Sequence, residues 1–266
     1  MDVIQALILG VVQGLTEFLP VSSSGHLVLV PALFGWESPG LAFDTILHLG
    51  TLVAVLAYFR EDWGRLIGAG LRSLAARRIA TADERLAWFV IIGCIPAGIA
   101  GIALGDFFEG LFHQPNVAGY FLFVTAGLLV SAELIGRRER ELSKLRLPDA
   151  MLIGVAQAIA ILPGVSRSGA TISGALAMGL TREAGARFSF LLGTPAILGA
   201  GLVQVPKALD GVRAGGDALP LVIGFVASAI IGYLAISLFL RYLRTRSLYP
   251  FAIYCAVLGL VIALTL

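Results

Sequence analysis

Residues 3–36, VIQALILGVVQGLTEFLPVSSSGHLVLVPALFGW, consist of two apolar arms around a polar turn. Neither arm, 3–19 nor 27–36, reaches the length of about 20 residues that a helix needs to cross a bilayer. Residues 147–180 repeat this arrangement, again with a proline and a cluster of hydroxyl groups at the break. Short apolar arms around a polar turn favour re-entrant hairpins, which enter and leave the membrane by the same face. Such backbone is tolerated at membrane depth only if it is buried in protein or lines a wet cavity.

The composition of the chain is that of a membrane protein. Of its 266 residues, 58% are hydrophobic and 14% are charged, and the mean hydropathy is +0.92. A soluble domain has about 45–50% apolar and about 25% charged residues. These figures exclude disorder, a coiled coil and nucleic-acid binding, and the net charge of +2 leaves room only for local basic sites. The two cysteines, Cys94 and Cys255, lie in apolar runs, which predicts neither a disulfide framework nor a metal site.

Six further apolar stretches are long enough to cross the membrane. Four contain no charged residue, whereas the first carries Asp44 and His48 and the third carries Glu133. The six stretches are 43–59, 86–105, 117–136, 188–206, 218–240 and 247–266. The predicted fold is an all-α polytopic membrane protein with six transmembrane helices and two re-entrant helix-turn-helix hairpins.

The basic residues predict the orientation, because cytoplasmic loops are enriched in Lys and Arg. The 60–85 loop contains Arg60, Arg65, Arg72, Arg77, Arg78 and Arg85, and the 137–146 loop contains Arg137, Arg138, Arg140, Lys144 and Arg146. Both are therefore expected to be solvated loops on the cytoplasmic face, with both termini on the outer face. Residues 1–25 are not expected to be a signal peptide, since no Lys or Arg precedes Arg60.

The two halves of the chain are copies of one another. Gly10-Val11, Gln13, Val21-Ser22 and Ser24-Gly25 match Gly154-Val155, Gln157, Val165-Ser166 and Ser168-Gly169 at a constant offset of 144, and Leu49-Gly50-Thr51 matches Leu192-Gly193-Thr194. Within one membrane domain, 1–266, we expect repeat one at 1–144 and repeat two at 145–266, each with one hairpin and three spans. An odd number of crossings inverts the second half relative to the first. Inverted-topology repeats place their broken helices tip to tip near the midplane, which points to a ligand there.

The first hairpin offers an acid, a histidine and three hydroxyl groups. Gln13 and Glu17 share one helix face at i, i+4 spacing. A buried carboxylate is costly in a bilayer, so Glu17 is expected to hold a divalent cation or to orient and deprotonate a neighbour. The alternative is a helix-end carboxylate that reaches water. Ser22-Ser23-Ser24-Gly25-His26 could be a simple N-cap, or an anion site in which His26 carries a proton for a serine nucleophile or for the leaving group.

The second hairpin offers a guanidinium. Arg167 is the only base between 147 and 181, within Pro163-Gly-Val-Ser-Arg-Ser-Gly-Ala-Thr171. A guanidinium is a planar fork that suits phosphate oxygens. The alternative is a structural ion pair with Glu17, which does not exclude function. Asp44, His48, Glu133 and Gln157 are lesser candidates, and His48 is assigned to packing. These groups together suit phosphoryl transfer on a lipid that carries the phosphate.

Gln13-Gly-Leu-Thr-Glu17-Phe-Leu-Pro-Val-Ser-Ser-Ser-Gly-His26 and Pro163-Gly-Val-Ser-Arg-Ser-Gly-Ala-Thr171 resemble the two signature motifs of the bacitracin-resistance type of bacterial undecaprenyl-diphosphate phosphatase. The resemblance covers essentially the whole chain. It implies hydrolysis of undecaprenyl diphosphate to the monophosphate in the bacterial inner membrane, which recycles the lipid carrier of peptidoglycan synthesis, with a divalent cation, Mg²⁺ or Ca²⁺. A homodimer is one of the oligomeric states left open.

The resemblance also implies roles for single residues. Glu17 corresponds to the essential acid and metal ligand, Ser23 to the nucleophile, His26 to the histidine beside it, and Arg167 to the phosphate clamp. The residues expected to bind substrate around them are Ser22, Ser24, Gly25, Gly164, Ser166, Ser168, Gly169 and Thr171. The family often has Glu where this chain has Gln13, so a metal-ligand role for Gln13 is in question. Attack by Ser23 and direct attack by water are equally compatible with these residues, and the site is expected to open outward.

The main alternative class is a transporter, either a lipid-phosphate flippase or a small-anion carrier, because inverted repeats with broken helices are common there. Anion binding alone does not require Glu17 and His26, so an enzyme is the preferred hypothesis. A structural membrane subunit without chemistry leaves the Ser, His and Arg clusters unexplained.

Overall fold

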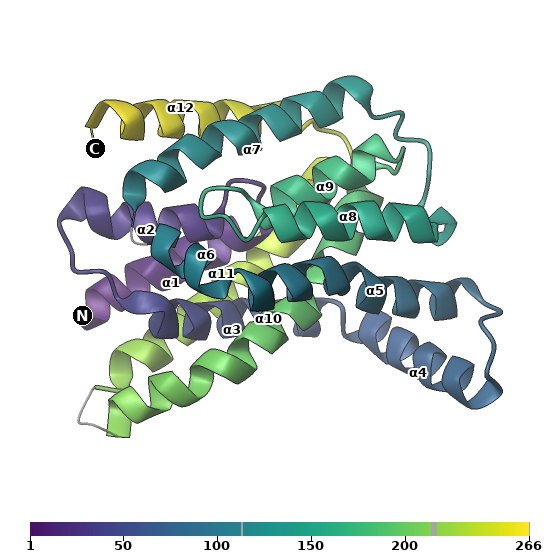
Figure 1. The fold of residues 1–266 in the computed structure, drawn as a ribbon, viewed down its shortest axis with the longest axis horizontal. Coiled ribbons are helices and arrows are strands. Elements are labelled where there is room, and N and C mark those ends of the chain that lie inside the picture. Colours follow the sequence, from purple (N-terminus) through teal and green to yellow (C-terminus); the bar gives the residue numbers. More distant parts are fainter. Residues whose placement is uncertain (113, 214–216, 266) are drawn as a thin grey trace.

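The computed structural model describes residues 1–112, 114–213 and 217–265, without the side chains of 207–213. Within these ranges the chain forms twelve α-helices, one 3-10 turn at Leu142–Lys144 and no β-strand (Figure 1). The first half contains α1 (Val3–Phe18), α2 (Ser23–Phe34), α3 (Gly40–Tyr58), α4 (Arg60–Ala76), α5 (Ala82–Ala103), α6 (Gly105–Phe112) and α7 (Pro115–Ile135). The second half contains α8 (Leu147–Ile159), α9 (Arg167–Ala177), α10 (Arg182–Arg213), α11 (Leu219–Leu243) and α12 (Tyr249–Thr265). A short helix pair followed by three apolar helices thus occurs twice, apart from the additional α4 and α6.

Local sequence explains why the first helix pair is broken. α1 begins with a capping box, in which Gln5 N donates to Asp2 Oδ1 at 2.7 Å and Asp2 N donates to the Gln5 side chain at 3.1 Å. It ends at Phe18 because Pro20 forces the preceding residue, Leu19, into extended backbone, with φ −70° and ψ 142°. The chain then turns and restarts as α2, so the two short helices are separated by a polar turn as predicted.

Five of the six predicted spans are long apolar helices. These are Gly40–Tyr58, Ala82–Ala103, Pro115–Ile135, Arg182–Pro206 and Leu219–Leu243, each long and apolar enough to cross a membrane. The sixth prediction, 247–266, corresponds to the apolar but shorter α12, and residue 266 lies outside the described residues. The all-helical, polytopic fold is confirmed, and the chain is a multi-pass membrane protein.

The prediction of a simple solvated loop at 60–85 is wrong. Residues 60–76 form α4, which ends where Arg77 adopts a positive φ of 49°. Its side chains Leu66 and Ala69 are buried, and Trp88 Nε1 of α5 donates to Ser73 Oγ at 2.9 Å. α4 forms because apolar residues recur on the face that packs against α5, while most of its charged residues are exposed. The exception is Asp62, which pairs with Arg187 of α10 at 2.8 Å. The short helix α6 was also not predicted.

The two halves exchange contacts. α1 of the first half packs on α11 of the second, and α8 of the second half packs in the same manner on α5 of the first. α3 packs on α10, and α7 on α12, so each of these pairs joins equivalent helices of the two halves. The first helix of each broken pair therefore packs on a long helix from the opposite half.

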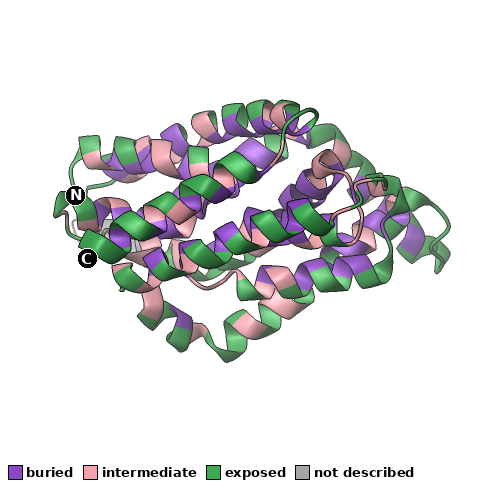
Figure 2. Ribbon diagram, turned by 90° about the horizontal axis from the view of Figure 1, so that it is seen from above, coloured by how far each residue is buried: buried purple, intermediate pink, exposed green. Residues whose placement is uncertain are grey.

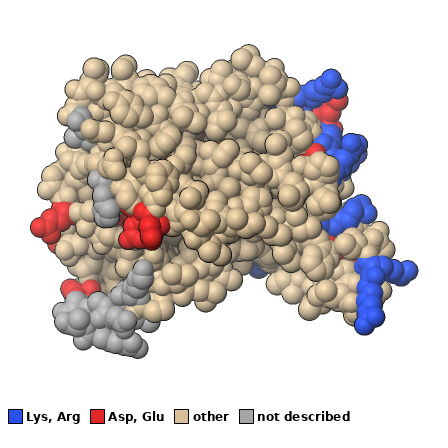
Figure 3. All heavy atoms as spheres, in the orientation of Figure 1, with Lys and Arg blue, Asp and Glu red and all other residues tan. Residues whose placement is uncertain are grey.

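Surface chemistry separates the two ends of the molecule. The visible Lys and Arg side chains gather at the end where α4 meets α5 and α7 meets α8 (Figure 3), and both termini lie at the opposite end (Figure 1). Along the sides, buried residues face inward and exposed residues face outward (Figure 2), and the exposed ones include large apolar side chains such as Leu202 and Leu264. An apolar outer surface between polar ends is what a bilayer requires.

Buried charge ties helices together at the basic end. The Glu133 carboxylate of α7 accepts two hydrogen bonds from the Arg182 guanidinium of α10, at 2.7 and 2.5 Å. Leu248 N, just before α12, donates to the same carboxylate at 2.7 Å. Glu133 therefore joins three helices in the structure and does not line the cavity described below.

Candidate active site

The two polar turns are built in the same way. Ser22 caps α2, because Gly25 N donates to its Oγ at 3.2 Å, and Ser166 caps α9, because Gly169 N donates to its Oγ at 3.0 Å. In each turn the capping hydroxyl lies within hydrogen-bond distance of the serine two residues later, at 3.3 Å in the first turn and 3.1 Å in the second. The turns also touch, since Ser168 Oγ donates to Leu19 O at 3.0 Å. The repeat found in the sequence is thus also a repeat of hydrogen bonds.

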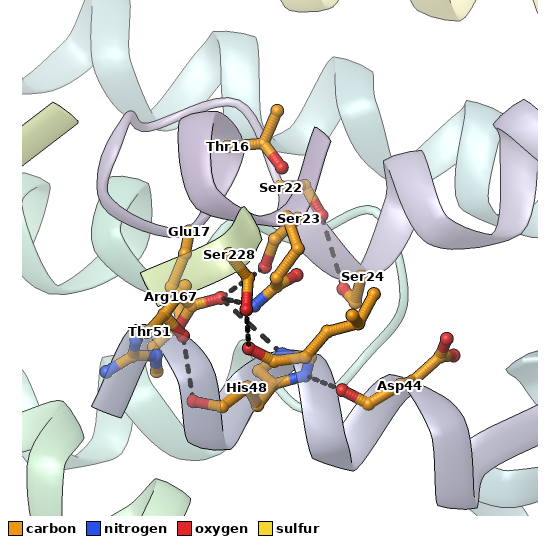
Figure 4. A network of polar contacts seen from close by, with 12 residues as sticks. Thr16, Glu17, Ser22, Ser23, Ser24, Asp44, His48, Thr51, Arg167 and Ser228 are labelled. Atoms are coloured by element: carbon orange, nitrogen blue, oxygen red, sulfur yellow. Dashed lines mark hydrogen bonds and ion pairs between the residues drawn. The ribbon is translucent and has the colours of Figure 1, made fainter. Parts of the chain in front are cut away.

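The residue between the paired serines differs, and it carries the candidate chemistry. Ser23 in the first turn and Arg167 in the second occupy matched positions, and both bind Glu17 of α1 (Figure 4). Ser23 Oγ donates to Glu17 Oε2 at 2.6 Å, and the Arg167 guanidinium pairs with Glu17 Oε1. Gln13 Nε2 donates to Oε2 at 2.9 Å. The predicted pairing of Arg167 with Glu17 is confirmed.

His48 of α3 also reaches this carboxylate. Its Nε2 lies 3.5 Å from Glu17 Oε2, and its Nδ1 lies 2.7 Å from Asp44 O (Figure 4). Since a carbonyl oxygen only accepts, Nδ1 carries the proton and donates to Asp44 O. The ring of His48 lines the same cavity as Glu17, whereas the sequence favoured packing over catalysis for this residue. Which of the two roles it has stays a prediction.

A cavity of about 280 Å³ lies in front of these groups. One part of its wall is polar and contains Glu17, Ser23, Ser24, Asp44, Thr45, His48 and Arg167. The remainder is apolar and contains Leu27, Leu41, Phe112, Ala160, Ile161, Val165, Ala196, Ile197 and Ala200. A cavity that joins a small polar wall to an apolar one suits a charged headgroup attached to a lipid chain.

Seven residues predicted to bind substrate lie outside the cavity wall: Ser22, Gly25, Gly164, Ser166, Ser168, Gly169 and Thr171. In the structure they hold the turns. Thr171 Oγ1, for example, donates to Arg167 O at 2.7 Å and lies 2.6 Å from Ser189 Oγ. Gly164 has a φ of 95°, a conformation that favours glycine, and a Cβ there would collide with Ala118 O. Their contact with substrate stays a prediction.

His26 is also outside the cavity wall. Its side chain is buried on α2, with Nδ1 2.7 Å from Ser22 O and Nε2 2.7 Å from the Tyr254 hydroxyl of α12. Both ring nitrogens are therefore engaged, and the partner of the Ser23 hydroxyl is Glu17. A role for His26 in proton transfer stays a prediction.

Comparison with known proteins decides the family. The family model described as "Bacitracin resistance protein BacA" matches residues 6–261. The chain belongs to the BacA family.

Its curated relatives are similar over nearly their full length. A protein of Desulforudis audaxviator is 48% identical over 262 residues, which cover 98% of this chain and 97% of the relative. One from Thermomicrobium roseum is 47% identical over 274 residues, covering 99% and 98%, and one from Methanosphaera stadtmanae is 44% identical over 271 residues, covering 98% and 97%. All three are named undecaprenyl-diphosphatase.

Two further residues position the site of this BacA-family chain and were not identified from the sequence. A Cβ at Gly193 of α10 would collide with the Arg167 guanidinium, so the glycine makes room for that side chain. Thr125 Oγ1 of α7 donates to Gly164 O and accepts from Ser166 N, both at 2.9 Å, and so fixes the second turn. Gly193 belongs to the Leu-Gly-Thr segment that is repeated in the two halves, and this repeat could have identified it. Thr125 belongs to no such repeated segment.

The donor atoms of the site suit a cation that is shared with a phosphate. Glu17 supplies a carboxylate, and Asp44 Oδ1 is a buried oxygen without a hydrogen-bond partner among the described residues. Within that part of the BacA-family chain, no three Asp, Glu, His or Cys side chains converge on one point. Mg²⁺ is commonly held by one or two carboxylates together with substrate phosphates, and this donor set fits that pattern. Gln13 directs its amide nitrogen at Glu17, so in this structure it supports the acid.

Proposed function

We propose that this chain hydrolyses undecaprenyl diphosphate to undecaprenyl phosphate and inorganic phosphate, and that it thereby recycles a lipid carrier and confers bacitracin resistance. The observation that carries the proposal is the arrangement around Glu17, where a hydroxyl and a guanidinium bind opposite oxygens of one buried carboxylate. The cavity beside them has both a polar and an apolar wall. The activity named for the curated relatives supports the same conclusion.

Arg167 is the phosphate clamp in this mechanism. Without substrate its charge is balanced by Glu17. A diphosphate that enters the cavity offers a stronger, bidentate partner for the guanidinium fork, so Arg167 turns from the carboxylate toward the phosphate oxygens. This exchange leaves Glu17 with its hydrogen bond from Ser23 and free to accept a proton.

Ser23 is the nucleophile in the form of the mechanism that we favour. Glu17 Oε2, 2.6 Å from Ser23 Oγ, accepts the hydroxyl proton while Oγ bonds to the terminal phosphorus. The bond from that phosphorus to the bridging oxygen breaks, and lipid monophosphate leaves. Glu17 passes its proton to the leaving lipid monophosphate. Water then attacks the phosphorus of the phosphoserine and gives a proton to Glu17, the bond from phosphorus to Ser23 Oγ breaks, and Oγ takes that proton back as inorganic phosphate leaves. Direct attack by a water held on Glu17 uses the same base and the same clamp, and the two routes differ only in whether a phosphoserine forms.

A divalent cation would balance the charge of the bound diphosphate in the proposed reaction. When bound, Mg²⁺ or Ca²⁺ would neutralise the negative charge of the phosphate oxygens. Glu17 and Asp44, the two carboxylates on the cavity wall, are the residues that would hold it.

The membrane orientation is also part of the proposal. The enrichment of Lys and Arg in cytoplasmic loops supports a cytoplasmic location for the basic end of the molecule, with both termini at the opposite, outer end (Figures 1 and 3). We expect the site to open on that outer face as well. The two helix pairs then enter as re-entrant hairpins from opposite faces of an inner membrane. A homodimer is not required, because both turns of the site belong to one chain.

A flippase or small-anion carrier is the alternative that must be separated by experiment. The hydrogen bond from Ser23 to Glu17 favours hydrolysis, since an anion carrier does not require a hydroxyl paired with a base. The decisive measurement is phosphate release from undecaprenyl diphosphate by purified protein in detergent, with Mg²⁺, with Ca²⁺ and with chelator. We expect cation-dependent release by wild type and none by a folded Glu17→Ala variant. Well-folded wild type that releases no phosphate would overturn the proposal and favour transport.

A further inference from the structure

The first turn is strained where the second is relaxed. Ser22 has φ 70° and ψ 90°, whereas its copy Ser166 has φ −67° and ψ 121°. A positive φ is costly for a residue with a Cβ and persists only when surrounding contacts enforce it.

The difference between the turns follows from one sequence position. The second turn reverses direction at Gly164, whose φ of 95° costs a glycine little. The matched residue in the first turn is Pro20, whose ring fixes φ near −65°. The reversal therefore falls on Ser22, directly before Ser23.

The His26 side chain braces this strained residue. Ser22 O accepts from His26 N at 3.1 Å, and His26 Nδ1 lies 2.7 Å from the same oxygen. A carbonyl only accepts, so Nδ1 carries the proton. Neutral His26 then has a bare Nε2, which accepts from the Tyr254 hydroxyl at 2.7 Å.

The relaxed copy lacks this brace. The residue that matches His26 in the second half is Ala170, whose side chain cannot bond to the Ser166 carbonyl. α12 contacts the first turn a second time through Cys255, whose thiol lies 3.7 Å from Pro20 O. The imidazole is thus present in the turn with strain and absent from the turn without it.

We propose that His26 and Tyr254 are positioning residues, which hold the Ser22 peptide in its strained conformation and thereby aim the Ser23 hydroxyl at Glu17. Tyr254 orients the imidazole, the imidazole donates to Ser22 O, and the fixed peptide sets the direction of the next side chain. This inference rests on the proposed hydrolysis of undecaprenyl diphosphate for its activity readout.

The central test compares His26→Asn with His26→Ala. An asparagine amide can occupy the place of Nδ1–H and donate to Ser22 O, but it cannot carry a proton. In the phosphate-release assay, His26→Ala is expected to lower kcat on the order of 100-fold with KM little changed, because the nucleophile is misaimed. His26→Asn should recover most of that loss and remain within about 5-fold of wild type, because one neutral hydrogen bond is replaced by another.

Tyr254→Phe tests the second member of the pair. Loss of the hydroxyl leaves Nε2 without its donor, and kcat should fall about 5-fold. The matched control is Tyr249→Phe, on the same helix and partly exposed, which should behave as wild type. The ¹⁵N spectrum of histidine-labelled protein provides a readout that does not depend on activity. We expect the His26 ring to be the Nδ1–H tautomer, with an Nε2 resonance that shifts in Tyr254→Phe and not in Tyr249→Phe.

The outcomes separate the two proposals. If wild type releases no phosphate, the proposed function fails, and the ¹⁵N spectra still decide whether Tyr254 holds the imidazole. If wild type is active but His26→Asn is as slow as His26→Ala, and both are folded, His26 acts by proton transfer and the positioning role is overturned. Whether or not wild type is active, an unshifted Nε2 resonance in Tyr254→Phe would overturn the proposal that Tyr254 orients the His26 ring.

Discussion

The turn at residues 19–26 and the turn at residues 163–170 are built from the same parts, yet they do different work. The residues that match between them are the capping serines Ser22 and Ser166 and the serines two positions later, and these hydroxyls are used within the turns or between them. The residues that do not match differ in chemistry. The position of Ser23 is occupied by Arg167 in the second half, and the position of Glu17 is occupied by Ile161.

This difference separates architecture from chemistry within one chain. The matched serines build the two turns, whereas Ser23 and Arg167, which differ between the halves, meet at the Glu17 carboxylate. Ile161 illustrates the point, since it lines the same cavity as Glu17 but contributes only apolar surface. Variants that treat the two turns unequally are therefore the sharpest way to test the assignment.

The largest effect is expected from Glu17→Gln. The amide cannot accept the Ser23 proton and no longer balances the Arg167 charge, so phosphate release should fall on the order of 1,000-fold. The assay is initial-rate phosphate release from undecaprenyl diphosphate in detergent. Glu61→Gln, at an exposed position of α4, is the matched control and should retain the wild-type rate. If Glu17→Gln keeps more than about a tenth of the wild-type rate, a general base at this position is excluded.

Arg167→Lys is expected to have the next largest effect. Lysine keeps the charge but loses the planar fork, so the rate should fall about 100-fold. The same phosphate-release assay measures this rate. The control is Arg244→Lys, in the exposed ion pair with Glu183, which should keep the wild-type rate. Near-normal turnover of Arg167→Lys would show that a positive charge alone suffices, and would contradict the assignment of Arg167 as a bidentate phosphate clamp.

Gly193→Ala should displace the clamp without removing it. The added methyl group would overlap the Arg167 guanidinium, which must shift, and we expect about a 10-fold lower rate. Gly199→Ala lies on the same helix with open space around its Cβ and should be neutral. Equal rates for the two variants would mean that the position of the guanidinium is not critical.

The smallest effect on catalysis, and the clearest on stability, is expected from Gly164→Ala. The substitution forces a Cβ onto a φ of 95° and against Ala118 O, so the free energy of unfolding should fall by about 2–4 kcal/mol. Gly35→Ala shares a positive φ but meets open space, and should cost only about 1 kcal/mol. Chemical denaturation in detergent measures both. Indistinguishable losses would indicate that the second turn does not depend on close packing at Gly164.

Much of this fold was predictable because its signals are local or repeated. Apolar length identified five long helices, the proline-containing breaks identified both helix pairs, and the offset of 144 brought the two turns together. The pairing of Glu17 with Arg167 followed from that juxtaposition, because each is a lone charge in an apolar surrounding. α4 was missed because its charges were counted as a loop, although its buried face follows helical spacing.

The rest depends on contacts that leave no pattern in the sequence. His48 shares its helix with apolar residues, and only the packing of α3 beside the turns brings its ring to Glu17. Tyr254 lies 228 residues from His26, on a helix that is mostly apolar. Such long-range contacts depend on how the helices are arranged. Each requires only one polar side chain at the position where two helices meet, so the sequence contains no recurring pattern that would reveal it.

The placement of Ser23 and Arg167 at equivalent positions has a consequence for symmetry. Two identical halves meeting about a two-fold axis could present two hydroxyls or two guanidinium groups, but never one of each to the same carboxylate. Joining the halves in one polypeptide removes that restriction, because each copy can then change alone. Separately expressed pieces 1–144 and 145–266 would accordingly complete a site only as a mixed pair, and a pair of like halves would have either an attacking group or a clamp, but not both.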